Sequence, residues 1–170
     1  MSSNPSPYDR ARLILAEYAR KPTVYLAGPI VGLTYEEAAT WRLRATKYLS
    51  PGVTTLDPMR GKLAWYDEAT KTYPLYPRNK IVADDLDDIR RSDAILVNLM
   101  QPSTYVGTLM ELGVALERKI PVFAYARPGG YIDMNHPFIQ SVIASYSTYT
   151  SLVLNHILAY FGKEGGLSAE

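Results

Sequence analysis

The stretch Thr23-Val-Tyr-Leu-Ala-Gly28-Pro29 decides the fold class of this sequence. It is a short run of apolar and β-prone residues that ends at a Gly-Pro pair, which is typical of a buried strand running into a loop. A helical pattern follows over residues 34–49, where Thr34 and Glu37 have the spacing of a capping box. The core is therefore predicted to begin with a strand and a crossover helix.

Strand-like and helix-like segments continue to alternate along the chain. Further strands are expected over residues 53–56, 93–98 and 120–125, and further helices over residues 78–91, 106–118, 136–144 and 151–161. This alternation predicts a doubly wound α/β fold, in which helices cover both faces of a parallel sheet and ligands bind beyond the carboxyl ends of the strands. We expect one domain over residues 23–162, a helical extension over residues 1–22 and a flexible tail over residues 163–170.

The composition restricts the classes of function. The 170 residues include 18 Lys and Arg and 17 Asp and Glu, so the chain lacks the basic surplus of proteins that bind nucleic acid polymers. It has no cysteine and two histidines, which argues against thiolate zinc sites and cysteine nucleophiles. No run approaches the roughly 18 apolar residues of a membrane span, and the first residues do not resemble a signal peptide. We therefore expect a cytoplasmic protein with no metal and no membrane partner.

Sequence motifs of the common cofactor sites are missing. Gly28-Pro29 follows a predicted strand but does not belong to a G-x-G-x-x-G fingerprint, and Gly61-Lys62 lacks the upstream glycine of a P-loop. The G-x-S-x-G elbow of serine hydrolases is also absent. The motifs therefore favour none of these three site types.

Four aspartates crowd the expected helix over residues 78–91. At an advance of about 100° per residue, Leu86 and Ile89 share a face with Val82, and Asp85 lies about 60° from Val82 at the edge of this apolar stripe. The other three, which point away and are expected to form a solvated face, are Asp84, Asp87 and Asp88. Asp85 is therefore the candidate for chemistry, and its alternative role is to pair with an arginine or to cap a backbone group.

Glu111 is the lone acid of a helix that is apolar nearly all round, Val106 to Leu116. A buried carboxylate costs several kcal/mol unless it is paired or neutralised, so Glu111 is a candidate functional group. However, Thr108 and Glu111 also have capping-box spacing, and Glu111 could serve only to close the start of its helix. The spacing leaves both roles open.

Four segments, taken in order, resemble the nucleoside 2-deoxyribosyltransferase family. They are Tyr25-Leu-Ala-Gly-Pro29, Asp57-Pro-Met-Arg-Gly-Lys62, Asp85-Leu-x-x-Ile89 leading into Ser92 to Asn98, and Gly107-Thr-Leu-Met-Glu-Leu-Gly113 with a Lys-x-Pro-Val strand after it. The resemblance covers about residues 23–125. It implies a flavodoxin-like sheet and an enzyme that acts on a nucleoside or nucleotide and a free nucleobase, usually as a homo-oligomer.

The resemblance also implies roles for individual residues. Glu111 matches the nucleophile, Asp85 the acid that handles the leaving base, and Tyr25 the tyrosine that orients the nucleophile. Residues implied to bind the substrate are Gly28, Asp57, Arg60, Asn98, Ser103, Gly107 and Met110. Cleavage of an N-glycosidic bond produces an oxocarbenium-like sugar, which a carboxylate can stabilise and trap while an acid protonates the base, so this chemistry requires no metal or organic cofactor.

One position departs from the family pattern. Transferases of the family often carry an aspartate just before the Val-Gly of this loop, and here that place is Tyr105. Gln101-Pro-Ser103 instead resembles the loop of the related nucleoside-monophosphate N-glycosidases, whose serine binds a 5′-phosphate. A transferase is the leading hypothesis, a monophosphate hydrolase is the alternative, and a nucleotide-binding sensor without turnover is the third.

Overall fold

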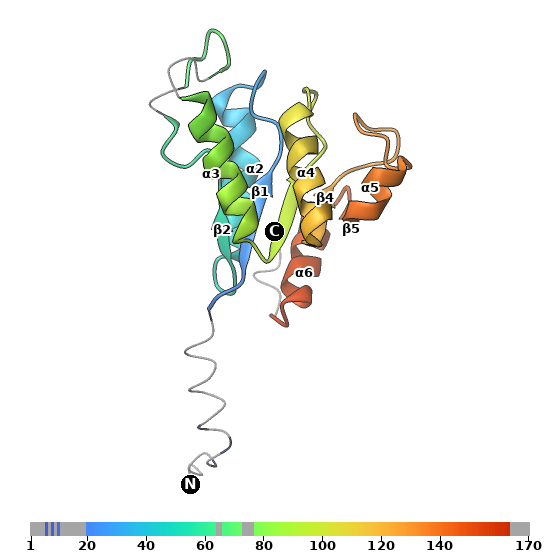
Figure 1. The fold of residues 1–170 in the computed structure, drawn as a ribbon. Helices are drawn as coiled ribbons and strands as arrows, with labels where there is room; N and C mark the ends of the chain where they lie inside the picture. Colours follow the sequence, from blue (N-terminus) through green and yellow to red (C-terminus); the bar gives the residue numbers. More distant parts are fainter. Residues whose placement is uncertain are drawn as a thin grey trace.

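A computed structural model of the chain describes residues 6, 8, 10, 20–63, 66–72 and 77–163. Its described residues form one sheet of five parallel strands in the order β2-β1-β3-β4-β5 (Figure 1). The strands are β1 (Thr23–Ala27), β2 (Thr54–Leu56), β3 (Ala94–Asn98), β4 (Val122–Tyr125) and β5 (Ile143–Ser147). This is the strand order of flavodoxin-like proteins, so the predicted fold class is confirmed.

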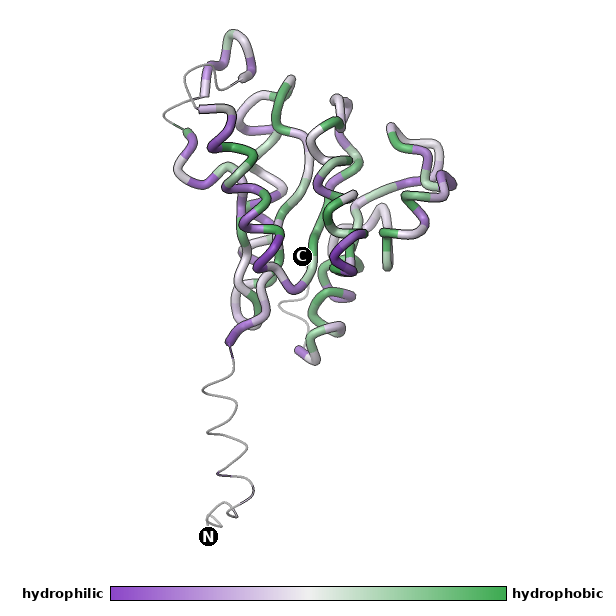
Figure 2. Tube along the Cα trace, in the orientation of Figure 1, coloured by the Kyte–Doolittle hydropathy of each residue, from purple (hydrophilic) through white to green (hydrophobic). Residues whose placement is uncertain are grey.

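Helices cover both faces of the sheet, as the alternating pattern predicted. The helices are α2 (Tyr35–Leu49), α3 (Arg78–Arg90), α4 (Val106–Arg118), α5 (Pro137–Val142) and α6 (Thr150–Tyr160). Helices α3, α4 and α5 lie over one face, and α2 and α6 lie over the other (Figure 1). The strongly hydrophobic residues follow the central strands between these layers (Figure 2). Buried parallel strands are expected to be apolar on both faces, which explains the short continuous apolar runs.

The two-residue period of β1 sends its side chains alternately to the two layers. Tyr25 and Ala27 pack in the cluster under α3, α4 and α5, whereas Val24 and Leu26 pack in the cluster under α2 and α6. All four side chains are fully buried. The register of β1 therefore points Tyr25 toward α4, the helix that carries Glu111.

Two local predictions have different outcomes. The capping box at the start of α2 is confirmed, because Thr34 and Glu37 each accept a hydrogen bond from the other's backbone N–H. The helix expected over residues 136–144 is confirmed as far as Val142, but its last two residues belong to β5, a strand that the sequence did not predict. The residues of β5 alternate between half-buried and exposed, so this edge strand lacks the continuous apolar run that marked the inner strands.

The prediction that Asp88 belongs to a solvated acidic face is also wrong. Asp88 is 1% exposed and accepts hydrogen bonds from Arg60 and Arg91, whereas Val82, the centre of the predicted apolar stripe, is 58% exposed. The reason is that α3 packs against the loop that contains Arg60 as well as against the core, which turns Ile89 rather than Val82 to the centre of the buried face.

Some predictions fall on residues outside the described ranges. The expected N-terminal extension over residues 1–22 lies mostly among them, as does the tail over residues 163–170. None of the helices in the described part of the chain is both long and apolar enough to cross a membrane.

Candidate active site

A cavity of about 350 Å³ opens at the carboxyl ends of β1 and β3, between the N-terminal halves of α3 and α4. It is lined by Gly28, Pro29, Ile30, Val31, Lys62, Ile81, Asp85, Thr104, Val106, Gly107, Thr108 and Glu111. The strand order reverses its direction at β1 and β3, and such switch points are the usual ligand sites of doubly wound folds. The volume suits a nucleoside-sized ligand. Two carboxylates face this cavity, Asp85 from α3 and Glu111 from α4.

Tyr25 and Glu111 form the central contact of the site. The buried Tyr25 hydroxyl donates a hydrogen bond to Glu111 Oε1 at 2.8 Å. Burial, followed by the negative charges of Glu111 and Asp85, raises the pKa of Tyr25 well above its ordinary value, so the hydroxyl remains a donor at neutral pH. The carboxylate of Glu111 is thereby held in one orientation at the edge of the cavity.

Burial is the main reason that the pKa of Glu111 rises from its ordinary 4.5 to about 7. The hydrogen bond from Tyr25 lowers this pKa, the charge of Asp85 raises it, and the charges of Arg42 and Lys62 lower it. A carboxyl with this pKa is ionised in a large fraction of molecules at neutral pH and is weakly solvated, as a nucleophile should be.

The capping role considered for Glu111 is excluded by its position. The residue that precedes α4 is Tyr105, and Thr108 and Glu111 both lie inside the helix. Thr108 and Leu112 are buried on the same inward stripe, and Glu111 lies between them with its carboxylate on Tyr25. The lone acid of this helix is therefore turned to the cavity and not to the helix start.

Asp85 enters the cavity from α3 and meets Lys62. Lys62 Nζ lies 3.4 Å from Asp85 Oδ1, and both side chains are largely buried, at 7% and 17% exposed. Burial raises the pKa of Asp85, while the ammonium of Lys62 lowers it. Asp85 can therefore hold a proton or release it inside the cavity, as a group that exchanges a proton with a ligand must.

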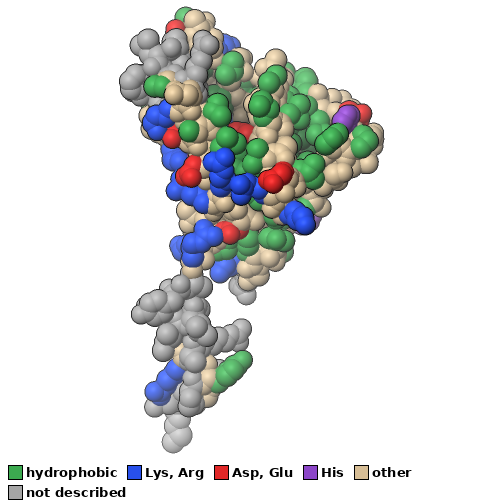
Figure 3. Space-filling view, in the orientation of Figure 1, with side chains coloured by type: hydrophobic (Ala, Val, Ile, Leu, Met, Phe, Trp, Pro, Cys, Tyr) green, Lys and Arg blue, Asp and Glu red, His purple; other side chains and the backbone are tan. Residues whose placement is uncertain are grey.

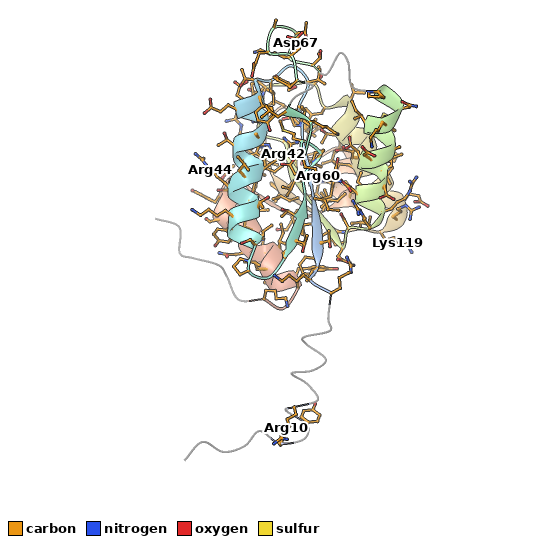
Figure 4. All side chains as sticks on the ribbon, turned by 90° about the vertical axis from the view of Figure 1, so that its left-hand side faces the viewer. Arg10, Arg42, Arg44, Arg60, Asp67 and Lys119 are labelled. Carbon is orange, nitrogen blue, oxygen red and sulfur yellow. The ribbon has the colours of Figure 1, made fainter. Side chains whose placement is uncertain are left out.

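A buried arginine shapes the floor of the cavity. Arg42 is 0% exposed and points from α2 toward the sheet, while its neighbour Arg44 points away (Figure 4). Its guanidinium donates to the backbone carbonyls of Leu26 and Gly28 and lies 3.6 Å from the Asp57 carboxylate. Sequence reasoning missed Arg42 because a cation on an expected helix carries no signal of burial.

Gly28 is required where β1 leaves the sheet. Its φ of +154° is unfavourable for residues with a side chain, and an added Cβ would lie 3.0 Å from the Trp41 ring. The carbonyl of Gly28 is held by Arg42 at 2.8 Å. The Trp41 ring and the Arg42 guanidinium thus fix the backbone of Gly28 at the cavity floor.

The structure brings some of the sequence-predicted site residues together and leaves others apart. Those that line the cavity or contact a lining carboxylate are Tyr25, Gly28, Asp85, Gly107 and Glu111. The other predicted substrate-binding residues, which do not line it, are Asp57, Arg60, Asn98, Ser103 and Met110.

The residues outside the lining have other contacts in the described part of the chain. Arg60 pairs with Asp88, and Asn98 accepts a hydrogen bond from the backbone of Met100. Ser103 Oγ donates to the Val31 carbonyl at 2.9 Å and so ties the loop after β3 to the loop after β1. Met110 is 71% exposed on the outer side of α4.

Two observations refine the sequence prediction. Tyr105, which stands where transferases often carry an aspartate, is 5% exposed, and its hydroxyl donates to the Gln101 carbonyl. It therefore packs in the core instead of holding a ligand. Lys62, which the sequence offered as the end of the Asp57-to-Lys62 segment and as part of an incomplete P-loop, but not as a site residue, is a cation that lines the cavity.

Comparison with known proteins identifies the family and the fold of the chain. The sequence profile of the family described as nucleoside 2-deoxyribosyltransferase matches residues 24–144. Two solved structures share the fold, each at a TM-score of 0.62. A 2-deoxyribosyltransferase from Bacillus psychrosaccharolyticus is 19% identical, with 85% of this chain and 99% of that chain covered. A conserved protein from Enterococcus faecalis V583 is 18% identical, with 83% and 99% covered. No curated protein matches the sequence significantly. The profile match over most of the chain shows that this protein belongs to the nucleoside 2-deoxyribosyltransferase family.

Proposed function

We propose that this protein is a nucleoside 2-deoxyribosyltransferase. It cleaves the N-glycosidic bond of a 2′-deoxynucleoside through a covalent glycosyl-Glu111 intermediate and transfers the deoxyribose to a second base. The observation that carries the proposal is the 2.8 Å hydrogen bond from Tyr25 to Glu111, in a cavity that Asp85 also lines. Membership of the family supports the same reaction class.

In the first half of the reaction, a carboxylate oxygen of Glu111 attacks C1′ while the bond from C1′ to the base nitrogen breaks. The electron pair of that bond leaves with the base, and Asp85 gives the base a proton. The transition state resembles an oxocarbenium ion, so the negative charge of Glu111 stabilises it before the covalent bond forms. Tyr25 keeps the attacking carboxylate in its orientation.

In the second half, a ring nitrogen of the incoming base attacks C1′, and the bond from C1′ to the Glu111 oxygen breaks. Its electron pair returns to Glu111, and the proton of the incoming base passes to Asp85, which restores the starting enzyme. Each half inverts the configuration at C1′, so the complete reaction retains it.

The experiment that tests this proposal is incubation with a panel of deoxynucleosides and their 5′-monophosphates, with and without free adenine. Chromatography of bases and products then follows. We expect a new deoxynucleoside only when the free base is present. Release of free base from monophosphates regardless of added adenine would contradict transfer and support the hydrolase. Tight nucleotide binding without any product would support the sensor.

One observation favours a 5′-monophosphate N-glycosidase as a second candidate. The N-terminus of α4 lines the cavity with Thr104, Gly107 and Thr108, and helix N-termini stabilise phosphate groups. Ser103, which together with Tyr105 suggested this alternative, donates its hydroxyl hydrogen to the Val31 carbonyl instead of lining the cavity. For this reason we place the transferase first.

We further propose that the protein acts in the cytoplasm as a homo-oligomer. The cytoplasmic location rests on the sequence, and the oligomer rests on an apolar surface over α4 and α5 (Figure 3). There, Leu109, Met110, Tyr131 and Phe138 are 40–71% exposed beside a mainly apolar cavity of about 390 Å³. Large exposed apolar patches usually mark interaction sites. Sedimentation of a dimer or larger species supports the oligomer, and a monomer at all concentrations contradicts it.

A further inference from the structure

Lys62 is a buried cation in the active-site cavity for which the proposed reaction has no role so far. Its side chain is 7% exposed and lines the same cavity as Asp85 and Glu111. Desolvation of an ammonium is costly, and a surface position would avoid this cost. The burial of this lysine in a ligand cavity therefore indicates that its ammonium has a function there.

The loop that carries Lys62 is fixed against α3 by two ion pairs. Arg60 binds Asp88, and Lys62, two residues further along the loop, pairs with Asp85, which lies three residues before Asp88 on the helix. Gly61 between them has a φ of +69°, so the loop turns where a glycine permits it. The ammonium of Lys62 is thus held in place before a ligand arrives, which lowers the cost of binding.

The pair of Lys62 and Asp85 offers a ligand two different groups. The distance between Nζ and Oδ1 is 3.4 Å, longer than the usual 2.7–2.9 Å of a charge-assisted hydrogen bond. The carboxyl can donate or accept a proton, whereas an ammonium can only donate. A ligand that fits this pair therefore presents a nitrogen to Asp85 and, beside it, a hydrogen-bond acceptor to Lys62.

The edges of the nucleobases differ at this second position. Guanine and hypoxanthine place the O6 acceptor next to N7, whereas adenine places an amino donor there. An amino group would direct its hydrogens at the ammonium and leave both donors without an acceptor. A carbonyl oxygen, in contrast, gains negative charge as the base departs, so a cation beside it stabilises the transition state more than the ground state.

We propose that Lys62 selects the leaving base: its ammonium donates to a carbonyl oxygen beside the ring nitrogen that Asp85 protonates, so bases with an oxo group are preferred over those with an amino group. This inference rests on the proposed function, because it assumes that the base leaves beside Asp85. It assigns the 6-oxopurine deoxynucleosides as better donors of deoxyribose than deoxyadenosine.

The test compares deoxyinosine with deoxyadenosine, which differ in the 6-substituent, as donors to one common acceptor base. Their kcat/KM values are measured for the wild type, for Lys62→Met and for the control Lys80→Met. Lys80 also forms an ion pair with an aspartate of α3, Asp84, but it does not line the cavity. The ratio of the two values cancels those effects of the substitution that are common to both substrates, such as a general loss of folded protein.

We expect the wild type and Lys80→Met to favour deoxyinosine by about tenfold, as a correct polar contact to a base edge provides. Lys62→Met should abolish this preference, mainly through slower reaction of deoxyinosine. A wild type that favours deoxyadenosine overturns the inference without any variant. An equal loss for both substrates also overturns it, because Lys62 would then not distinguish the two bases.

The same experiment distinguishes failure of the proposed function from failure of the role of Lys62, and a second variant serves if Lys62→Met does not fold. If no donor of the panel supports exchange, the proposed function itself fails, whereas exchange without a 6-oxo preference removes only the role of Lys62. If Lys62→Met does not fold, as judged by circular dichroism, Lys62→Gln replaces it. The glutamine keeps a neutral donor and should retain part of the preference for deoxyinosine, and a preference unchanged from the wild type contradicts the inference.

Discussion

Replacement of Glu111 by Gln should stabilise the protein at alkaline pH while it abolishes base exchange. Glu111 lines the active-site cavity with its carboxylate on Tyr25, and burial raises its pKa from 4.5 to about 7. An amide keeps the shape of the side chain and can still accept the hydrogen bond from Tyr25, but it carries no charge. The substitution therefore removes the cost of ionising a buried carboxyl and changes little else.

The direction of the pH effect follows from the two pKa values. Between pH 4.5 and about 7 the folded protein keeps the Glu111 proton that the unfolded chain has already lost, so stability falls as pH rises through this window. Below pH 4.5 Glu111 is neutral in both the folded and the unfolded protein. Above about pH 7 the full free-energy cost of ionising Glu111 in the folded protein lowers the stability. At about 1.4 kcal/mol per pKa unit, the cost reaches at most about 3.5 kcal/mol.

Urea denaturation of the wild type and Glu111→Gln at pH 4.5 and pH 8.5 measures this cost. We expect the two proteins to be similar in stability at pH 4.5 and the variant to be more stable by up to about 3.5 kcal/mol at pH 8.5. Other titrating groups are common to both proteins and cancel in the difference. A stability difference that is the same at both pH values, or that grows toward acid, would refute the reasoning.

The other predictions concern the remaining residues of the site. In Tyr25→Phe, the acidic limb of kcat/KM should move to higher pH, because the hydrogen bond from Tyr25 lowers the pKa of Glu111; an unmoved limb would show that the bond has no such effect. Asp85→Asn should slow substrates with poor leaving bases far more than those with good ones, while Asp87→Asn, at a side chain that is 68% exposed on the same helix, leaves both unchanged. Equal slopes of rate against leaving-base pKa in these two variants would remove Asp85 from the reaction. Ser103→Ala should affect a deoxynucleoside and its 5′-monophosphate by the same factor, because the hydroxyl binds a neighbouring loop; a loss confined to the monophosphate would favour the hydrolase.

The sequence predicted the inner part of the fold well because each inner strand is a continuous apolar run followed by a helical pattern. The strands β1, β3 and β4 and the helices α2 and α4 lie within a few residues of their expected bounds. Strand β5 was missed because it lies at the sheet edge, where half-exposed residues carry no continuous apolar signal. Strand β2, at the other edge, was nevertheless predicted within one residue of its bounds, so the local pattern failed at one edge of the sheet only.

The candidate site shows the same division between local and tertiary information. Glu111 could be singled out because a lone acid in an apolar helix is anomalous by itself. Asp88 was misplaced because a helical wheel assumes one packing surface, while α3 also packs against the loop of Arg60. Burial of Lys62 and Arg42 depends on carboxylates and carbonyls from distant segments, which no local pattern of the sequence reveals.

Mass spectrometry of the quenched enzyme tests the central claim most directly. The protein is mixed with a deoxynucleoside alone, quenched in acid, digested and mapped, beside Glu111→Gln treated in the same way. We expect one deoxyribosyl group on the peptide that contains Glu111 in the wild type, its disappearance when a free base is added before the quench, and no label in the variant. Base exchange that proceeds with the label on another residue, or equally well in Glu111→Gln, would contradict a glycosyl-Glu111 intermediate.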